Sequence, residues 1–263
     1  MDDDNYIEIP KEMRSSYIYR IVSVERLFEL FENRQNVLVK PKKWQDPFEN
    51  FILRAETRLQ TGQRARFAFH DQFYGQCWTL QSASDAMWRI YSPAGDAVRI
   101  RSTIRTVAES FSRELGDYAQ IRAFIGKVRY LPNKRLLEFA SSWFPGTGRL
   151  SARTSAETLL VKRPAFKHER EIRLLYFQHH AGDALNDLYL YNVNPHEFID
   201  QIIIDPRVPG SEANVLKERI RNRTGYRGRI LRSLLYAPPP SLIIQGSSAP
   251  NHPSQRTLAS ERR

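Results

Sequence analysis

Two glutamates separated by one residue, Glu169 and Glu171, are the first feature of the sequence that could perform chemistry. They open the run 169–177, whose apolar and aromatic composition predicts a strand. Alternate residues of a strand share a face, so we expect both carboxylates on one side. One carboxylate close to a sugar can stabilise an oxocarbenium-like charge, and the other can accept a proton. Alternatively, both glutamates form cross-strand ion pairs with Arg170 and Arg173 on a solvated face.

Arg20 is the second candidate, near the end of a run of β-branched and aromatic residues, 17–22, that predicts a strand. The planar fork of donors on an arginine is suited to a phosphate group. The alternative is a structural role, in which Arg20 pairs with Asp46 or Glu49 and holds the loop 40–50. Ser23 follows as a predicted N-cap, and a helical pattern of apolar residues begins at Val24.

Aromatic residues and one serine complete the candidate site. Trp78 lies in a predicted buried strand, 75–80, while Trp88 and Tyr91 lie on a short predicted helix. Any of these rings could stack on a planar ligand, although the spacing of Trp88 and Tyr91 is also typical of a core-facing helix. Ser102 ends a predicted half-exposed strand, 97–102, and is a candidate for holding the geometry of a binding site.

The basic composition suggests anionic partners. The chain has 263 residues and a formal net charge of +11, which attracts polyanions such as nucleic acid or an acidic protein. Five basic residues are candidates for a nucleic-acid-binding face: Lys42, Lys43, Arg219, Arg223 and Arg227. The alternative is that these side chains form ordinary solvated faces.

Composition also limits the class of protein. The single cysteine, Cys77, excludes an intramolecular disulfide and a multi-cysteine zinc site, and we expect no metal. No run of about 18 apolar residues suggests a membrane span, and the acidic start does not resemble a secretory signal. We therefore expect a cytoplasmic protein without membrane contact.

The predicted elements favour an α+β fold. Strands and helices mix without regular alternation, so we expect a mixed or split β-sheet flanked by helices. We expect a flexible N-terminus over 1–14, one domain over 15–236 and a disordered, proline- and serine-containing tail over 237–263. Residues 51–70 are expected to be helical.

Several short motifs carry a resemblance to a known family. They are Tyr19-Arg20, Trp44-x-Asp46-Pro47-Phe48-Glu49, Trp88-x-x-Tyr91 before a Val-Arg-Ile strand, and Lys162 to Glu169-x-Glu171-x-Arg173. Over about residues 15–235 the chain resembles bacterial domain-of-unknown-function family 2971. That resemblance implies no activity.

A second resemblance, to mono-ADP-ribosyltransferases of the arginine-serine-glutamate class, implies a chemistry. The chain has Arg20, Ser102-Thr103 and Glu169-x-Glu171 in the order of that class. The resemblance implies NAD as substrate, Arg20 on a phosphate or ribose of NAD, and Ser102 holding the site. Glu171 would stabilise the ribose oxocarbenium, and Glu169 would orient the acceptor or accept its proton.

We therefore expect an NAD-consuming enzyme that acts as an intracellular toxin or phage-defence effector, with a cognate antitoxin or defence partner. Two hypotheses from other classes stay open. One is a non-catalytic nucleic-acid-binding protein that uses the basic face, and the other is an antitoxin-like protein-interaction module.

Overall fold

The computed structural model describes residues 1–239, apart from residues 45, 59–61, 67–70, 144–150 and 180–185. The described strands are β1 (Tyr6–Ile7), β2 (Tyr17–Ser23), β3 (Gln35–Val39), β4 (Glu56–Arg58), β5 (Arg64–Arg66), β6 (Phe73–Thr79), β7 (Ala97–Thr103), β8 (Ala123–Lys127), β9 (Arg129–Tyr130), β10 (Val161–Lys162), β11 (Glu171–Phe177), β12 (Leu188–Asn192), β13 (Gln201–Ile204) and β14 (Arg229–Arg232). The α-helices are α1 (Val24–Asn33), α2 (Asp85–Tyr91), α3 (Ile104–Leu115), α4 (Ala119–Arg122), α5 (Asn133–Trp143), α6 (Ala152–Thr158), α7 (Pro195–Phe198) and α8 (Gly210–Thr224).

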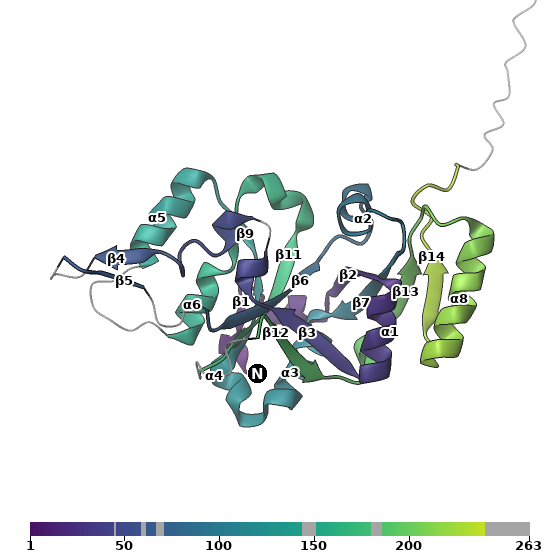
Figure 1. Ribbon diagram of the computed structural model, residues 1–263, viewed down its shortest axis with the longest axis horizontal. Helices are drawn as coiled ribbons and strands as arrows, with labels where there is room; N and C mark the ends of the chain where they lie inside the picture. The colour runs from purple at the N-terminus through teal and green to yellow at the C-terminus, as the bar shows by residue number, and fades with distance from the viewer. Residues whose placement is uncertain (45, 59–61, 67–70, 144–150, 180–185, 240–263) are drawn as a thin grey trace, which may run out of the picture.

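Ten of the described strands form one mixed sheet. Its order is β1-β8-β11-β6-β2-β7-β13-β14, with β3 paired to β6 and β12 paired to β3. Figure 1 shows α8 beside β14 at one end of the molecule, and α5, α6 and the β4–β5 hairpin at the other. The predicted α+β class, with a mixed sheet flanked by helices, is confirmed. In the part of the chain described here, no helix is long and apolar enough to cross a membrane.

Helix α1 shows how local sequence places β2. The Ser23 hydroxyl accepts the backbone N–H of Arg26 at 3.2 Å, as the predicted N-cap requires, and Arg34 ends the helix in the left-handed region. The helix buries one apolar face: Val24, Leu27, Phe28, Leu30 and Phe31. Each such side chain contributes about 1.5–3 kcal/mol relative to exposure. This burial fixes the C-terminal end of β2, the strand that carries Arg20.

Two expectations differ from the structure. The first residues are part of the fold, because β1 pairs with β8 and the buried Asn5 amide donates to the carbonyl oxygens of Ala119, Gln120 and Ala123. The expected helix over 51–70 is wrong, since β4 and β5 pair as an antiparallel hairpin. Gly62, between these strands, has φ +82°, which suits a turn and not a helix. The tail from residue 240 lies outside the described residues.

Strand β7 also differs from expectation, because it is not half-exposed. It lies between β2 and β13 in the sheet, and its burial extends to both faces. Polar side chains on this strand, including Arg99 and Ser102, are therefore buried. The alternation of apolar and basic residues correctly predicted a strand but did not predict its central position.

Candidate active site

The site forms where two neighbouring strands separate. Glu171 of β11, Thr79 of β6 and Tyr19 of β2 stand in register in one row across the sheet. Within the described chain, Tyr19 with Thr79 is the only register pair that joins β2 to β6. Further along, β6 pairs with β3 through Gly75 and Val39. Beyond the Tyr19–Thr79 pair, the sheet is therefore split between β2 and β6.

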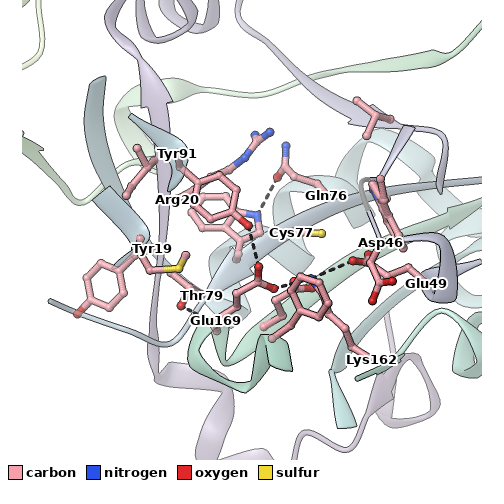
Figure 2. A pocket seen from close by; sticks show the side chains of 18 of the residues that line it. Tyr19, Arg20, Asp46, Glu49, Gln76, Cys77, Thr79, Tyr91, Lys162 and Glu169 are labelled. Carbon is pink, nitrogen blue, oxygen red and sulfur yellow. Dashed lines mark hydrogen bonds and ion pairs between the residues drawn. The ribbon is translucent and has the colours of Figure 1, made fainter. Parts of the chain in front are cut away.

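A cavity of about 310 Å³ occupies this region. Figure 2 shows side chains of this cavity, whose lining comes from β2, β3, β6 and α2, from the segment 43–49, and from residues 162–171 up to the start of β11. Five residues predicted for the site line it: Arg20, Trp78, Tyr91, Glu169 and Glu171. The lining also includes Lys43, a predicted nucleic-acid contact, and Tyr19, Ile21, Glu49, Gln76, Cys77 and Lys162.

Lys162 joins three carboxylates at the floor of the cavity. Its Nζ lies 2.5 Å from Glu169 Oε2, 2.8 Å from Glu171 Oε1 and 2.9 Å from Glu49 Oε1. Arg173 completes the cluster with Nε 2.6 Å from Glu171 Oε2 and Nη2 2.7 Å from Glu49 Oε2. All five side chains are buried, so these contacts operate with little screening by water.

The two glutamates do not share a strand, which corrects the prediction. Glu169 ends the 3₁₀ helix Pro164–Glu169, Arg170 follows with φ 44°, and β11 begins at Glu171. Their carboxylates nevertheless converge because both bind Lys162. The predicted ion pair between Glu171 and Arg173 exists, but it is buried in the cluster and does not lie on a solvated face.

The cluster separates the pKa values of the two glutamates. Burial raises the pKa of Glu169 to about 7, helped by the hydrogen bond and negative charge of Glu171 and opposed by Lys162. Burial also acts to raise the pKa of Glu171, but Arg173, Glu169 and Lys162 together hold it well below its ordinary value. Near neutral pH, Glu171 is therefore ionised while Glu169 exchanges a proton.

Two neighbours orient Glu169. The Tyr91 hydroxyl donates to Glu169 Oε1 at 3.1 Å, and the Thr79 hydroxyl donates to the backbone carbonyl of Glu169 at 2.5 Å. Burial and the charge of Glu169 raise the pKa of Tyr91, so its phenol stays protonated as a donor. Figure 2 shows the Tyr91 bond from α2 to the carboxylate.

Arg20 has no partner among the described residues. It makes no hydrogen bond or ion pair there, and burial lowers its pKa. The predicted structural alternative is wrong, because Asp46 pairs with Arg163 at 2.8 Å and Glu49 pairs with Lys162 and Arg173. Figure 2 shows no labelled carboxylate beside the Arg20 guanidinium. Arg20 is thus a cation on the cavity wall whose charge the described protein leaves unpaired.

Two predicted site residues lie elsewhere. Trp88 is 1% exposed and does not line the cavity, since its position on α2 turns it into the core. Ser102 is also 1% exposed, and its buried Oγ has no hydrogen-bond partner among the described residues. Ser102 therefore cannot contact a ligand in this cavity. Trp78, by contrast, lines the wall and donates from Nε1 to Gln76 Oε1 at 2.8 Å.

The predicted basic face is largely neutralised by acidic side chains. Lys42 and Lys43 pair with Asp187 at 2.6 and 2.9 Å. On α8, Arg219 pairs with Glu25 at 3.0 Å, and Arg223 pairs with Glu32 at 2.5 Å. Arg227 is exposed beyond the end of α8. The pairs leave less free positive charge for a polyanion than the net charge suggests.

Sequence reasoning gave no role to Lys162, and it considered Arg173 and Glu49 only as possible ion-pair partners. Each falls in a motif that the family resemblance used, but only the fold brings position 49 beside positions 162 and 173. Cys77 also lines the cavity, and burial strongly raises the pKa of its thiol. Among the residues that are described, no group of three or more His, Cys, Asp or Glu could hold a metal ion.

Comparisons with known proteins give no family for this chain. No protein-family model matches it, so the resemblance to family 2971 is not supported, and no curated protein matches it in sequence.

Solved structures of DarT from Thermus sp. 2.9 have a partly similar arrangement. They are complexes with NAD+, with carba-NAD+ and with ADP-ribosylated single-stranded DNA, at 12%, 12% and 11% identity. The matches cover 86%, 85% and 86% of this chain and 97%, 97% and 96% of the DarT chain, with TM-scores of 0.39, 0.37 and 0.39. Likeness of this degree identifies neither a ligand nor an activity of this chain.

Proposed function

We propose that the protein is an ADP-ribosyltransferase-like enzyme that uses NAD+ as a substrate. The observation that carries the proposal is the cavity at the split of the sheet, where the unpaired Arg20 and the carboxylates of Glu169 and Glu171 line one hollow. An arginine without a carboxylate partner favours a phosphate, and an ionised carboxylate favours a developing positive charge.

The reaction uses these groups in two stages. The bond between nicotinamide nitrogen and ribose C1′ breaks, its electron pair leaves with nicotinamide, and the positive charge moves to the ribose. Glu171, held ionised by Arg173 and Lys162, stabilises that charge. An acceptor then bonds to C1′, and its proton passes to the ionised form of Glu169.

The aromatic side chains supply the remaining requirement, a flat apolar wall for nicotinamide. Trp78 and Tyr91 both line the cavity, and Tyr91 also holds Glu169 through its hydroxyl. Stacking on either ring places the departing group near the carboxylates. Arg20 then holds a phosphate of the same dinucleotide, since its planar fork matches two phosphate oxygens.

The test is transfer from NAD+ labelled in its adenylate half, with purified protein and cell extract. We expect release of nicotinamide and labelled acceptor from the wild type. Glu171→Gln should lower the rate by about 10²–10³-fold, the usual effect of removing one transition-state stabilising group. Glu157→Gln is the control, because Glu157 lies on α6 and pairs with Arg153 outside the cavity.

Circular dichroism must show that both variants are folded. Absence of label transfer and of nicotinamide release in the wild type rejects the proposal. Equal rates for Glu171→Gln and Glu157→Gln reject the role of Glu171. A toxin or defence role predicts that wild-type expression arrests growth of a bacterial host and that Glu171→Gln expression does not.

A further inference from the structure

Helix α2 carries Tyr91 as its last residue, and this end of the helix depends on a distant part of the chain. The helix has only seven residues, and a helix this short is marginal on its own. Its N-terminal end is capped locally, because the Ser84 hydroxyl accepts the backbone N–H of Met87 at 3.3 Å. At the other end Ser92 has φ −138°, so no left-handed residue closes the helix. Carbonyl groups of the last turn are therefore left for donors from elsewhere.

Arg207 supplies donors to this end of α2, from 115 residues beyond Ser92. Its Nη2 donates to the backbone carbonyl of Ser92 and, at 3.4 Å, to that of Trp88. These two carbonyl groups stand on either side of Tyr91 in the chain, and a guanidinium here also meets the negative end of the helix dipole. The buried Trp88 side chain anchors the middle of the helix, so Arg207 acts on its last turn.

Asp205 holds the Arg207 guanidinium in place. Arg207 Nε lies 2.9 Å from Asp205 Oδ1, and Nη2 lies 2.6 Å from Oδ2, which is a two-bond pair. Asp205 Oδ2 also accepts the hydroxyl of Ser92 at 2.8 Å, and the Asp205 side chain is buried. Burial acts to raise the pKa of Asp205, but the hydrogen bonds from Arg207 and Ser92 hold it below its ordinary value. Asp205 is thus ionised near neutral pH and binds both the helix end and its donor.

Tyr91 connects this helix end to the cavity. Its ring lines the cavity, and its hydroxyl donates to Glu169 Oε1 at 3.1 Å (Figure 2). The other titratable groups that face Glu169 are Glu171 of β11, Lys162 of β10 and Tyr130 of β9. Tyr91 is the member of this set that α2 carries. A displaced helix end would therefore remove one donor from Glu169 and leave the other groups in place.

We propose that Asp205 and Arg207 are positioning residues, which hold the end of α2 so that the Tyr91 hydroxyl stays on Glu169. Together with Ser92 they form what we call the α2 clamp. In the proposed reaction Glu169 accepts a proton and Tyr91 borders nicotinamide, so loss of the clamp slows transfer. That consequence rests on the proposed function, whereas the hold of the clamp on Tyr91 does not.

The pKa of Glu169 in the ligand-free protein tests the clamp. It is followed by ¹³C NMR of the carboxyl carbon, with Glu169→Gln to assign the signal. A hydrogen bond to the ionised form lowers a carboxyl pKa, so Tyr91→Phe should raise the pKa of Glu169 by at least about half a pH unit. Arg207→Lys keeps the charge beside Asp205 but loses the planar fork that reaches the carbonyl groups and the carboxylate together. It should shift the pKa of Glu169 in the same direction.

Arg101→Lys is the matched control. It replaces an arginine that donates to Asp200 at 2.6 Å and lies outside the cavity, so the pKa of Glu169 should not change. A purely structural role of Arg207 would lower the Tm and leave this pKa where it is. If Arg207→Lys does not fold, Ser92→Ala, which removes one bond to Asp205, takes its place with the same expected direction.

A double-mutant cycle ties the effect to Tyr91. In a Tyr91→Phe background, Arg207→Lys should add no further shift, because the bond that the clamp positions is already absent. An unchanged pKa of Glu169 in Arg207→Lys overturns the inference, as does a shift that adds in full to that of Tyr91→Phe.

Turnover of NAD+ separates this inference from the proposed function. Arg207→Lys should lower the rate about tenfold, as a small displacement of a positioned group does, and the pH dependence of the rate should move upward with the pKa of Glu169. A shifted pKa in a protein that does not turn over NAD+ supports the clamp and rejects the proposed function. Turnover by the wild type, with the same pKa of Glu169 in Arg207→Lys, keeps the proposed function and rejects the clamp.

Discussion

Replacing Glu169 by glutamine should change how stability depends on pH. In the wild type the folded protein binds a proton at Glu169 with a pKa of about 7, against an ordinary value of 4.5 in the unfolded chain. A raised carboxyl pKa means that the folded state holds the proton more tightly. Its stabilising effect is fully present below pH 4.5 and is lost as the pH rises through 7. Glutamine cannot titrate, so Glu169→Gln lacks this dependence.

The size of the effect follows from the two pKa values. Each unit of difference between the folded and unfolded pKa values changes the free energy of unfolding by about 1.4 kcal/mol. The shift from 4.5 to about 7 therefore corresponds to about 3 kcal/mol. Lys162 lies 2.5 Å from the carboxylate and opposes the rise of the pKa. The pKa of about 7 is the balance of this effect and of burial. The free energy of unfolding of the wild type, minus that of Glu169→Gln, should therefore fall by about 3 kcal/mol between pH 4.5 and pH 8.

Urea unfolding at half-unit pH steps measures this difference. Other titrating groups are common to both proteins and cancel in the subtraction. Glu157→Gln, in which a carboxylate outside the cavity is replaced, should give a nearly constant difference. If the free energies of unfolding of the wild type and Glu169→Gln change with pH in parallel, the raised pKa of Glu169 is refuted. A difference that grows with pH would mean that folding lowers the pKa of Glu169 and does not raise it.

Three further changes test the geometry. Lys162→Met should lower the free energy of unfolding by about 3–5 kcal/mol in urea titrations near pH 8, because it leaves buried carboxylates uncompensated. Gly126→Ala should destabilise by about 1–3 kcal/mol, measured the same way, since its Cβ would lie 2.2 Å from Leu160 Cδ1. Ser102→Ala should leave NAD+ turnover within about twofold of wild type, since Ser102 lies outside the cavity. It should not lower the Tm, since its buried Oγ makes no hydrogen bond to any residue that the structure describes.

Local patterns predicted the elements that depend on neighbouring residues. The helix after Ser23 begins and buries its apolar face as expected, because its N-cap and its amphipathic pattern depend only on residues within a few helical turns. Helix α8, by contrast, leaves the apolar side chain of Val215 72% exposed. The direction of a helix face depends on which neighbour it packs against, and that neighbour is not encoded nearby in the sequence.

The charge cluster could not be predicted because its members come from distant positions. Arg173 pairs with Glu49, 124 residues earlier, only because the fold brings the turn at Pro47–Glu49 beside Arg173. The expectation that Glu169 extends the strand failed at Arg170, whose left-handed conformation separates the 3₁₀ helix from β11. Residue types identified the carboxylates, and the fold alone determined that one lysine binds both.

The net charge of +11 does not indicate where an anion would bind, whereas the pairing of individual side chains does. Exposed cations such as Arg219 and Arg223 have acidic partners nearby, and pairs of this kind are screened by water. Arg20, by contrast, lines the cavity and has no carboxylate partner among the described residues. Because desolvation at the cavity wall strengthens the field of this charge, a phosphate gains more by binding Arg20 than by binding a solvated arginine. The anion site is therefore expected at the split of the sheet and not on the most basic surface.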